Sequence, residues 1–278
     1  MPIMNSPVSN SPEMITFYSQ VREESERRAA PLSDEDCCVQ SMPDVSPTKW
    51  HLAHVSWFFE TFVLQEFLPG YQCFHPRYNF LFNSYYEAVG KRHARPHRGL
   101  LSRPGLADIM EYRKYVDQHM LELLAADVGK SEVVISRTIL GLNHEQQHQE
   151  LLLMDIKHVL SCNPLLPAYM DAENPVQTPL AALGWLDVET GIHELGYADR
   201  DADRSPFNYD NELPKHRIYQ QAAQLSDRLI SNGEYLEFIN AGGYQRSDVW
   251  LSDGWSLVQS ESWQAPLYWL SPDETGNA

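Results

Sequence analysis

The sequence has few cysteines and little positive charge, and each shortage excludes a class of protein. Four cysteines in 278 residues show no C-x-x-C spacing, and the adjacent Cys37 and Cys38 are poorly placed for a mutual bridge. We therefore predict free thiols, which are usual in a reducing compartment. Lys and Arg number 21 against 38 Asp and Glu, a formal net charge of -17. So acidic a chain repels phosphate backbones and anionic lipids, and we expect no nucleic-acid partner.

Long apolar runs are also missing. No stretch approaches the roughly 18 apolar residues that a membrane span needs, and residues 1–12 are polar and contain prolines, unlike a signal peptide. We expect no membrane partner and a cytoplasmic protein. What the chain does have is 43% hydrophobic and 11% aromatic residues, a composition typical of a folded globular protein.

Four segments show the hydrophobic periodicity of helices. They are residues 13–30, 48–67, 106–126 and 132–161. Ser46 and Pro47 predict the N-cap and first turn of the second helix. Residues 71–104 show no period and are rich in aromatic and basic residues, which indicates a long ordered loop of the kind that often carries function. Four helices with one long excursion predict a four-helix bundle.

The composition changes beyond Cys162. Short apolar runs there alternate with Pro, Gly, Asp and Trp, which is typical of strands and turns. We place the domain boundary between Pro167 and Pro179. The sequence therefore predicts an α+β protein, with a helical domain over residues 1–170 and a mixed α/β domain over residues 171–278.

Two histidines in the fourth predicted helix indicate a metal site. His144 and His148 are four residues apart, so they share one helix face and can converge on one metal ion. This spacing also arises readily by chance, and two solvent-facing histidines are the alternative interpretation. A metal site needs at least one further ligand.

His54, in the second predicted helix, is our candidate for that ligand. It lies among tryptophan and phenylalanine residues, so it should point into the bundle, where a buried imidazole needs a partner. A metal ion or a backbone carbonyl would serve. His51 is the competing candidate, but it shares a face with Val55 and Phe62, and we favour His54. Three neutral imidazoles would leave a divalent metal three open positions, which favours a thiolate and dioxygen as further ligands. From geometry alone, zinc is the default metal for this ligand set.

Three segments carry a resemblance to a known family: SPTKWHLAHVSWFFETFVL, FNSYYEAVG and LGLNHEQQHQELLLMDIKH. They resemble the ergothioneine-forming sulfoxide synthases, the EgtB family, and the similarity runs through nearly the whole chain. The resemblance implies a DinB-like four-helix bundle followed by a formylglycine-generating-enzyme-like domain of the C-type-lectin-like kind. It also implies iron(II), Fe(2+), held by His54, His144 and His148.

The resemblance further implies a reaction and roles for other residues. Family members use dioxygen to join a cysteine-type thiol to the imidazole of hercynine, and they oxidise the sulfur to a sulfoxide. Tyr85 and Tyr86 match a tyrosine pair that donates a proton near the iron, as a general acid can. Gln147 matches a residue that contacts the substrate imidazole. The thiol is cysteine or gamma-glutamylcysteine, and the tyrosine pair favours cysteine.

Three arginines, Arg95, Arg98 and Arg103, form a cluster in the long loop. Guanidinium groups bind carboxylates through paired hydrogen bonds, so we predict that the cluster grips the carboxylate of the thiol substrate. At least one of the three is expected to pair instead with an acidic residue of the protein itself.

The sequence departs from the family pattern at its end. FNYDNELPKHRI and NGEYLEFINAGGYQRSDVWLSDGW resemble the opening of the second family domain, but family members continue well beyond APLYWL, where this chain has SPDETGNA. We therefore expect an incomplete second domain, and metal binding that is separable from turnover. Alternative hypotheses are a DinB-like, zinc-dependent thiol transferase or hydrolase, a related enzyme acting on histidine itself, and a metal-binding fragment without activity.

Overall fold

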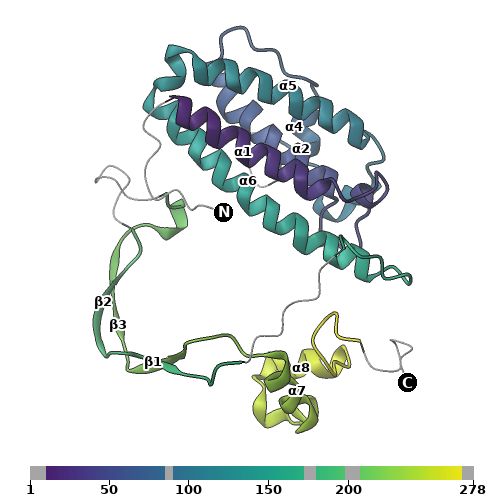
Figure 1. Ribbon diagram of the computed structural model, residues 1–278, viewed down its shortest axis with the longest axis vertical. Helices are drawn as coiled ribbons and strands as arrows, with labels where there is room; N and C mark the ends of the chain where they lie inside the picture. The colour runs from purple at the N-terminus through teal and green to yellow at the C-terminus, as the bar shows by residue number, and fades with distance from the viewer. Residues whose placement is uncertain (1–10, 85–89, 172–179, 198–206, 271–278) are drawn as a thin grey trace. The chain divides into compact units, whose positions relative to one another are not determined.

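The computed structural model describes residues 11–84, 90–171, 180–197 and 207–270. The chain divides into two compact units, residues 1–173 with 196–215, and residues 174–195 with 216–278. The first is helical and the second contains small antiparallel sheets (Figure 1). The predicted α+β class is therefore confirmed. The domain limits that we predicted, 1–170 and 171–278, stay a prediction.

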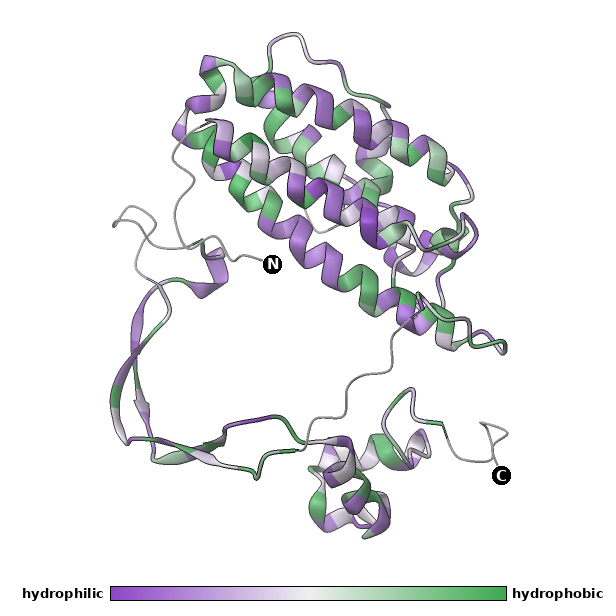
Figure 2. Ribbon diagram, viewed as in Figure 1, coloured by the Kyte–Doolittle hydropathy of each residue, from purple (hydrophilic) through white to green (hydrophobic). Residues whose placement is uncertain are grey.

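Four long helices of the first unit pack side by side. They are α1 (Ser11–Ala29), α2 (Thr48–Phe59), α5 (Leu106–Ala125) and α6 (Glu132–Ser161). Both α1 and α2 contact α5 and α6. Hydrophobic and hydrophilic residues alternate along α1, α5 and α6 (Figure 2), as expected where a helix buries one face. The buried faces meet in one core, which includes Tyr18, Trp57, Phe59, Tyr112 and Leu142.

Helix α2 is the centre of this unit, because all twelve of its residues are buried. The chain does not continue from it as the single regular helix that we predicted over residues 48–67. A π-helical turn, Glu60–Leu64, joins α2 to a short α3 (Gln65–Phe67). Glu60 at the start of this turn is buried, and its carboxylate accepts hydrogen bonds from the hydroxyls of Tyr71 and Tyr112, each at 2.7 Å. A buried carboxylate needs such donors, so the turn is tied to the segment that follows it.

The predicted N-cap of α2 was wrong by one residue. Pro47, not Ser46, holds the N-cap position. The backbone N–H of Ser46 instead donates to Asp155 Oδ2 on α6 at 2.8 Å, and the Ser46 hydroxyl accepts from Arg98 at 2.8 Å. Tertiary hydrogen bonds thus replace the local cap that the sequence pattern indicated.

The long segment between α3 and α5 is ordered where the structure describes it. It contains α4 (Tyr78–Phe82) and a 3-10 helix, Arg95–Leu100. The buried Lys49 of α2 donates to the carbonyls of Leu101 and Pro104 at 2.6 and 3.0 Å. The segment is therefore held against α2, the helix that carries His54.

The second unit is built from two antiparallel strand pairs and two short helices. β1 (Trp185–Val188) pairs with β4 (Ala223–Ser226), and β2 (Gly191–Leu195) pairs with β3 (His216–Gln220). The helices are α7 (Asn232–Asn240) and α8 (Ser252–Ser260). α7 begins with a capping box, in which Ser231 accepts from the backbone of Glu234 and the Glu234 carboxylate accepts from the backbone of Ser231.

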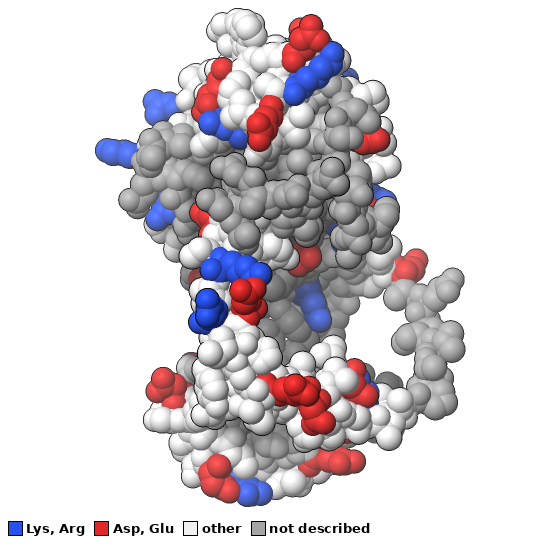
Figure 3. Space-filling view, turned by 90° about the vertical axis from the view of Figure 1, so that its left-hand side faces the viewer, with Lys and Arg blue, Asp and Glu red and all other residues white. Residues whose placement is uncertain are grey.

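The described surface fits the acidic composition. In the view of Figure 3, acidic and basic side chains are interspersed, and the described atoms on that face form no broad basic patch. Within the described ranges, no helix has both the length and the apolar character that crossing a membrane requires.

Candidate metal centre

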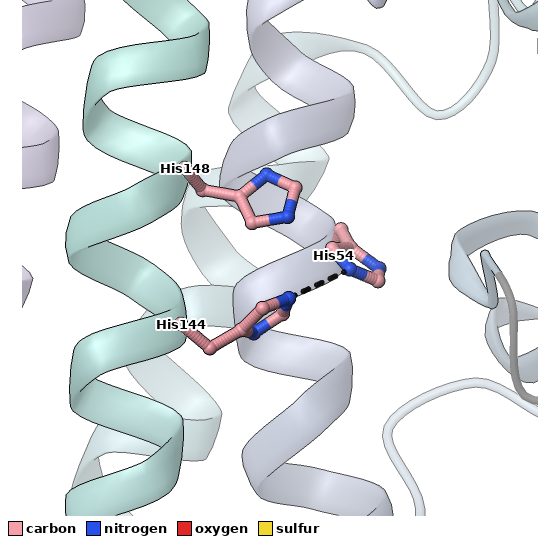
Figure 4. A group of neighbouring side chains, drawn as sticks. All are labelled: His54, His144 and His148. Atoms are coloured by element: carbon pink, nitrogen blue, oxygen red, sulfur yellow. Dashed lines mark hydrogen bonds between the residues drawn. The ribbon is translucent and has the colours of Figure 1, made fainter. Parts of the chain in front are cut away.

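The three predicted metal ligands lie together in the helical unit. His54 comes from α2, and His144 and His148 come from α6, and each offers a ring nitrogen within 4.8 Å of the others (Figure 4). The Nε2 atoms of His54 and His144 are 3.2 Å apart. When two nitrogens each lie about 2.1 Å from one metal ion and the nitrogen–metal–nitrogen angle is about 90° to 109°, the nitrogens are roughly 3.0 to 3.4 Å from each other. This spacing therefore fits two imidazoles bound to the same ion.

The orientation of His54 is fixed by one hydrogen bond and by two stacked tryptophan rings. Its Nδ1 lies 2.6 Å from the carbonyl oxygen of Phe82, so Nδ1 carries the proton and donates it, and the lone pair is on Nε2. The ring is stacked against Trp50, with centroids 4.6 Å apart, and against Trp57, at 5.4 Å. A metal-binding histidine is commonly oriented by such a hydrogen bond from its second nitrogen.

Burial keeps the three imidazoles neutral. It lowers the pKa of His54 and of His148 well below the ordinary value, and neighbouring positive groups lower both further. Burial lowers the pKa of His144 to about 4, against the opposing effect of Glu145. Neutral imidazoles offer the lone pairs that metal ions need.

His51, the candidate ligand that we set aside, contacts His148. The Nδ1 atoms of the two rings are 2.9 Å apart, and the Nε2 of His51 is 3.0 Å from Asp155 Oδ2. From the sequence we considered His51 only as a competing ligand and assigned no role to Asp155. A signal was present, because Asp155 follows His148 by seven residues and thus lies two turns further along the same face of α6.

His144 differs from the other two histidines. Its Nδ1 is buried and has no hydrogen-bond partner among the described residues, while its Nε2 faces that of His54. An unsatisfied buried nitrogen is uncommon and costly. The described residues thus leave Nδ1 of His144 without a hydrogen bond, while its Nε2 lies beside Nε2 of His54, in a position to bind the same metal ion.

The structure separates the three arginines predicted to bind substrate. Arg98 is buried, donates to the hydroxyls of Ser46 and Ser84 at 2.8 and 3.3 Å, and lies 3.4 Å over the ring of Trp50. Its charge contributes to the lowered pKa of His51, His54 and His148, so it is close to the site. Arg95 donates to the carbonyl of Asp44, and Arg103 is exposed.

The remaining predicted site residues are Gln147, Tyr85 and Tyr86. Gln147, between the two α6 histidines, is exposed. Tyr85 and Tyr86 lie outside the described residues. The roles of these three residues and of the arginines stay predictions.

The helical unit is similar to a known protein family. Residues 18–152 match the model of the DinB superfamily. This match covers α2, most of α1, all of α5 and the part of α6 that carries His144 and His148. These findings define a DinB-like helical domain that carries a histidine cluster.

Longer relatives extend the similarity into the second unit. The hercynine oxygenase of Mycobacterium tuberculosis is 28% identical over 265 residues, which are 95% of this chain and 59% of that protein. The hercynine oxygenase of Mycolicibacterium smegmatis is 28% identical over 249 residues, 89% of this chain and 55% of the relative. The chain spans little more than half the length of these relatives. These matches confirm the resemblance to the sulfoxide synthases.

Proposed function

We propose that this chain carries the metal centre of an ergothioneine-forming sulfoxide synthase, a hercynine oxygenase. The proposed reaction joins a cysteine-type thiol to the imidazole of hercynine, with dioxygen as oxidant, and leaves the sulfur as a sulfoxide. The observation that carries the proposal is the convergence of His54, His144 and His148. The names of the relatives support the choice of hercynine as substrate.

The proposed metal is iron(II), held by the three histidines. Bound iron(II) would supply the redox chemistry with dioxygen. The chain contributes neutral imidazoles, because burial lowers their pKa values. It also contributes fixed ring orientation, since Phe82 and the stacked Trp50 hold His54 in place. Pre-set ligands of this kind spare the site a rearrangement on binding.

Other residues of the chain are proposed to handle the substrates. Gln147 lies exposed next to the ligand His148, and its amide can both donate to and accept from the hercynine imidazole. Arg98 places a positive charge near the triad, which favours an anionic thiolate or carboxylate. Tyr85 and Tyr86 are proposed as proton donors. The thiol is proposed to be cysteine or gamma-glutamylcysteine.

The domain assignment is part of the proposal. Residues 1–170 would form the DinB-like four-helix bundle, and residues 171–278 would be part of a formylglycine-generating-enzyme-like domain. The strand pairs and short helices of the second unit are the observed elements of that proposed domain. Because the relatives are longer, turnover by this chain and metal binding by its histidines are tested separately.

The test loads the chain with iron(II) under anaerobic conditions, and then adds oxygen, hercynine and either thiol. We expect one iron per chain, oxygen uptake that depends on both substrates, and a hercynyl sulfoxide product by mass spectrometry. Iron binding without oxygen uptake would contradict turnover and leave a metal-binding fragment. Binding of zinc in preference to iron, with thiol transfer or hydrolysis that needs no oxygen, would favour the alternative DinB-like enzyme.

A further inference from the structure

A buried chain of hydrogen bonds runs from Asp155 through His51 to the ligand His148. We infer that Asp155 is a positioning residue for the metal centre. Acting through His51, it holds His148 in the one ring tautomer that leaves Nε2 free to bind the metal. The inference rests on the proposed metal centre and goes beyond it, because it assigns a role to two residues outside the ligand set.

The chain of hydrogen bonds starts at Oδ2 of Asp155, which acts as an acceptor. Asp155 Oδ2 lies 2.8 Å from the backbone nitrogen of Ser46, which can only donate. The same oxygen lies 3.0 Å from His51 Nε2. Asp155 is only 5% exposed and His51 only 4%, so water is largely excluded from both. An acceptor oxygen facing His51 Nε2 requires the proton of the imidazole to be on that nitrogen.

A neutral imidazole carries one N–H and one lone pair on its two ring nitrogens. If Nε2 of His51 carries the proton, its Nδ1 carries the lone pair. That Nδ1 lies 2.9 Å from Nδ1 of His148. Two lone pairs at this distance would repel, so His148 must be protonated on Nδ1 and donate.

The tautomer of His148 decides whether this ring can bind the metal. A neutral His148 protonated on Nδ1 has its lone pair on Nε2, and Figure 4 shows a ring nitrogen of His148 directed toward His54. His54 reaches the same tautomer by a different route, because its Nδ1 donates to the carbonyl of Phe82. The opposite tautomer of His148 would place a proton where the metal binds. A carboxylate at the end of the chain therefore selects the binding-competent form.

The matched variants are Asp155→Asn and, as control, Asp117→Asn. Asparagine keeps the size of the side chain but replaces the carboxylate with a neutral amide that can also donate. Asp117 is a partly buried aspartate of the same unit, and its described hydrogen bonds go to Tyr18 and Arg22, not to a triad histidine. Both variants lose one buried or partly buried charge, so a general loss of stability should appear in both.

The first measurement needs neither metal nor variant. Long-range proton–nitrogen NMR of the full metal-free chain, labelled with ¹⁵N-histidine, reads the tautomer of each ring. We expect His51 protonated on Nε2 and His148 on Nδ1. Finding His148 protonated on Nε2 would overturn the inference. Because this result is independent of metal binding, it stays decisive if Asp155→Asn does not fold.

The second measurement is the affinity for cobalt(II), a spectroscopic substitute for iron(II), by competition with a coloured chelator. We expect Asp155→Asn to bind about 10- to 100-fold more weakly than the native chain, and Asp117→Asn to bind as the native chain does. Native affinity and native tautomers in Asp155→Asn would overturn the inference and leave the metal centre intact. A native chain that binds no cobalt would instead refute the metal centre, while the NMR pattern would still judge the hydrogen-bonded chain.

Discussion

Arg22 of α1 and Glu145 of α6 form an ion pair in the interior of the helical unit, with 2.9 Å between Nη1 and Oε2. Glu145 is fully buried and follows the proposed ligand His144 in sequence. It also accepts hydrogen bonds from Ser25 at 2.7 Å and from Arg113 at 3.2 Å. One carboxylate therefore joins α1, α5 and α6 at the level of the metal centre. These charges lower the pKa of Glu145, although burial alone would raise it.

Replacing Glu145 with Gln should destabilise the helical unit strongly. The neutral amide would remove the fully buried counter-charge of Arg22 and Arg113, which would keep only the more exposed Asp117 and Glu26. Breaking a buried pair costs about 3 to 5 kcal/mol. Urea unfolding followed by far-ultraviolet circular dichroism measures the change. The matched control is Glu24→Gln, whose partners are the exposed Arg27 and the partly exposed Arg28. It should cost less than about 1 kcal/mol. Equal effects in the two variants would contradict the importance of the buried pair.

Acid should destabilise the metal-free protein over a defined pH range. The folded-state pKa of His144 is lowered to about 4, and those of His54 and His148 are also lowered. Below the unfolded pKa of about 6.5, the unfolded chain takes up protons that the folded chain does not. Unfolding free energy should therefore fall as the pH drops from about 6.5 toward 4, by roughly 1.4 kcal/mol per pH unit for each such histidine.

The same urea titration, repeated at several pH values, tests this dependence. His144→Gln removes one of the titrating groups. It should reduce the slope of unfolding free energy against pH by about 1.4 kcal/mol per pH unit, which corresponds to one proton. Stability that stays constant between pH 6.5 and 4.5 in the native chain would show that the imidazoles are not held neutral by burial.

Gly141 of α6 packs against the rings of Phe58 and Phe59 of α2. A Cβ atom at this position would lie 2.5 Å from Phe59 and 2.8 Å from Phe58, closer than packed atoms can be. Gly141→Ala should therefore destabilise the helical unit by about 1 to 3 kcal/mol, although alanine is the better helix former. In the control Gly233→Ala, in α7, the added atom meets nothing closer than 3.9 Å, so the melting temperature should not fall. A more stable Gly141→Ala variant would contradict the described packing.

Helix positions were largely predictable from the sequence, because each long helix except α2 alternates a buried and a solvent-facing side. The prediction for residues 132–161 agrees with α6 at both ends. α2 is the exception, since all of its residues are buried. We set His51 aside because it shares a face with Val55 and Phe62, but on a helix buried on every side that argument has no force. The π-helical turn after α2 depends on tertiary contacts of Glu60 and was not predictable from periodicity.

The candidate site was predictable in part. The i, i+4 pair on α6 and the histidine on the central helix were visible in the sequence, and the structure brings them together. The supporting residues were not visible, because buried charged residues such as Arg22 and Glu145 have the same pattern as surface residues. The hydrogen bond between Asp155 and His51 is found only when α2 and α6 are placed side by side.

Arg98 and Arg103 should behave differently when replaced. Arg98 is buried, holds Ser46 and Ser84, and covers Trp50, so Arg98→Ala should lower the unfolding free energy by about 2 to 4 kcal/mol through lost hydrogen bonds and a cavity. Arg103 is exposed, and Arg103→Ala should leave stability within about 0.5 kcal/mol of native. Urea unfolding compares the two variants. Equal stability of both would show that Arg98 is not part of the packed interior.

Removing a proposed ligand should abolish stoichiometric metal binding. His148→Ala leaves two imidazoles, and two ligands from one chain hold a divalent ion far less tightly than three, so we expect less than about a tenth of the native iron content after desalting. Metal analysis and cobalt(II) absorption of the desalted protein measure the loss. The control is His158→Ala on the same helix, where the ring meets Ser41 and Cys162 and is not a member of the triad. Full iron content in His148→Ala, or equal loss in both variants, would refute the assignment of the three ligands.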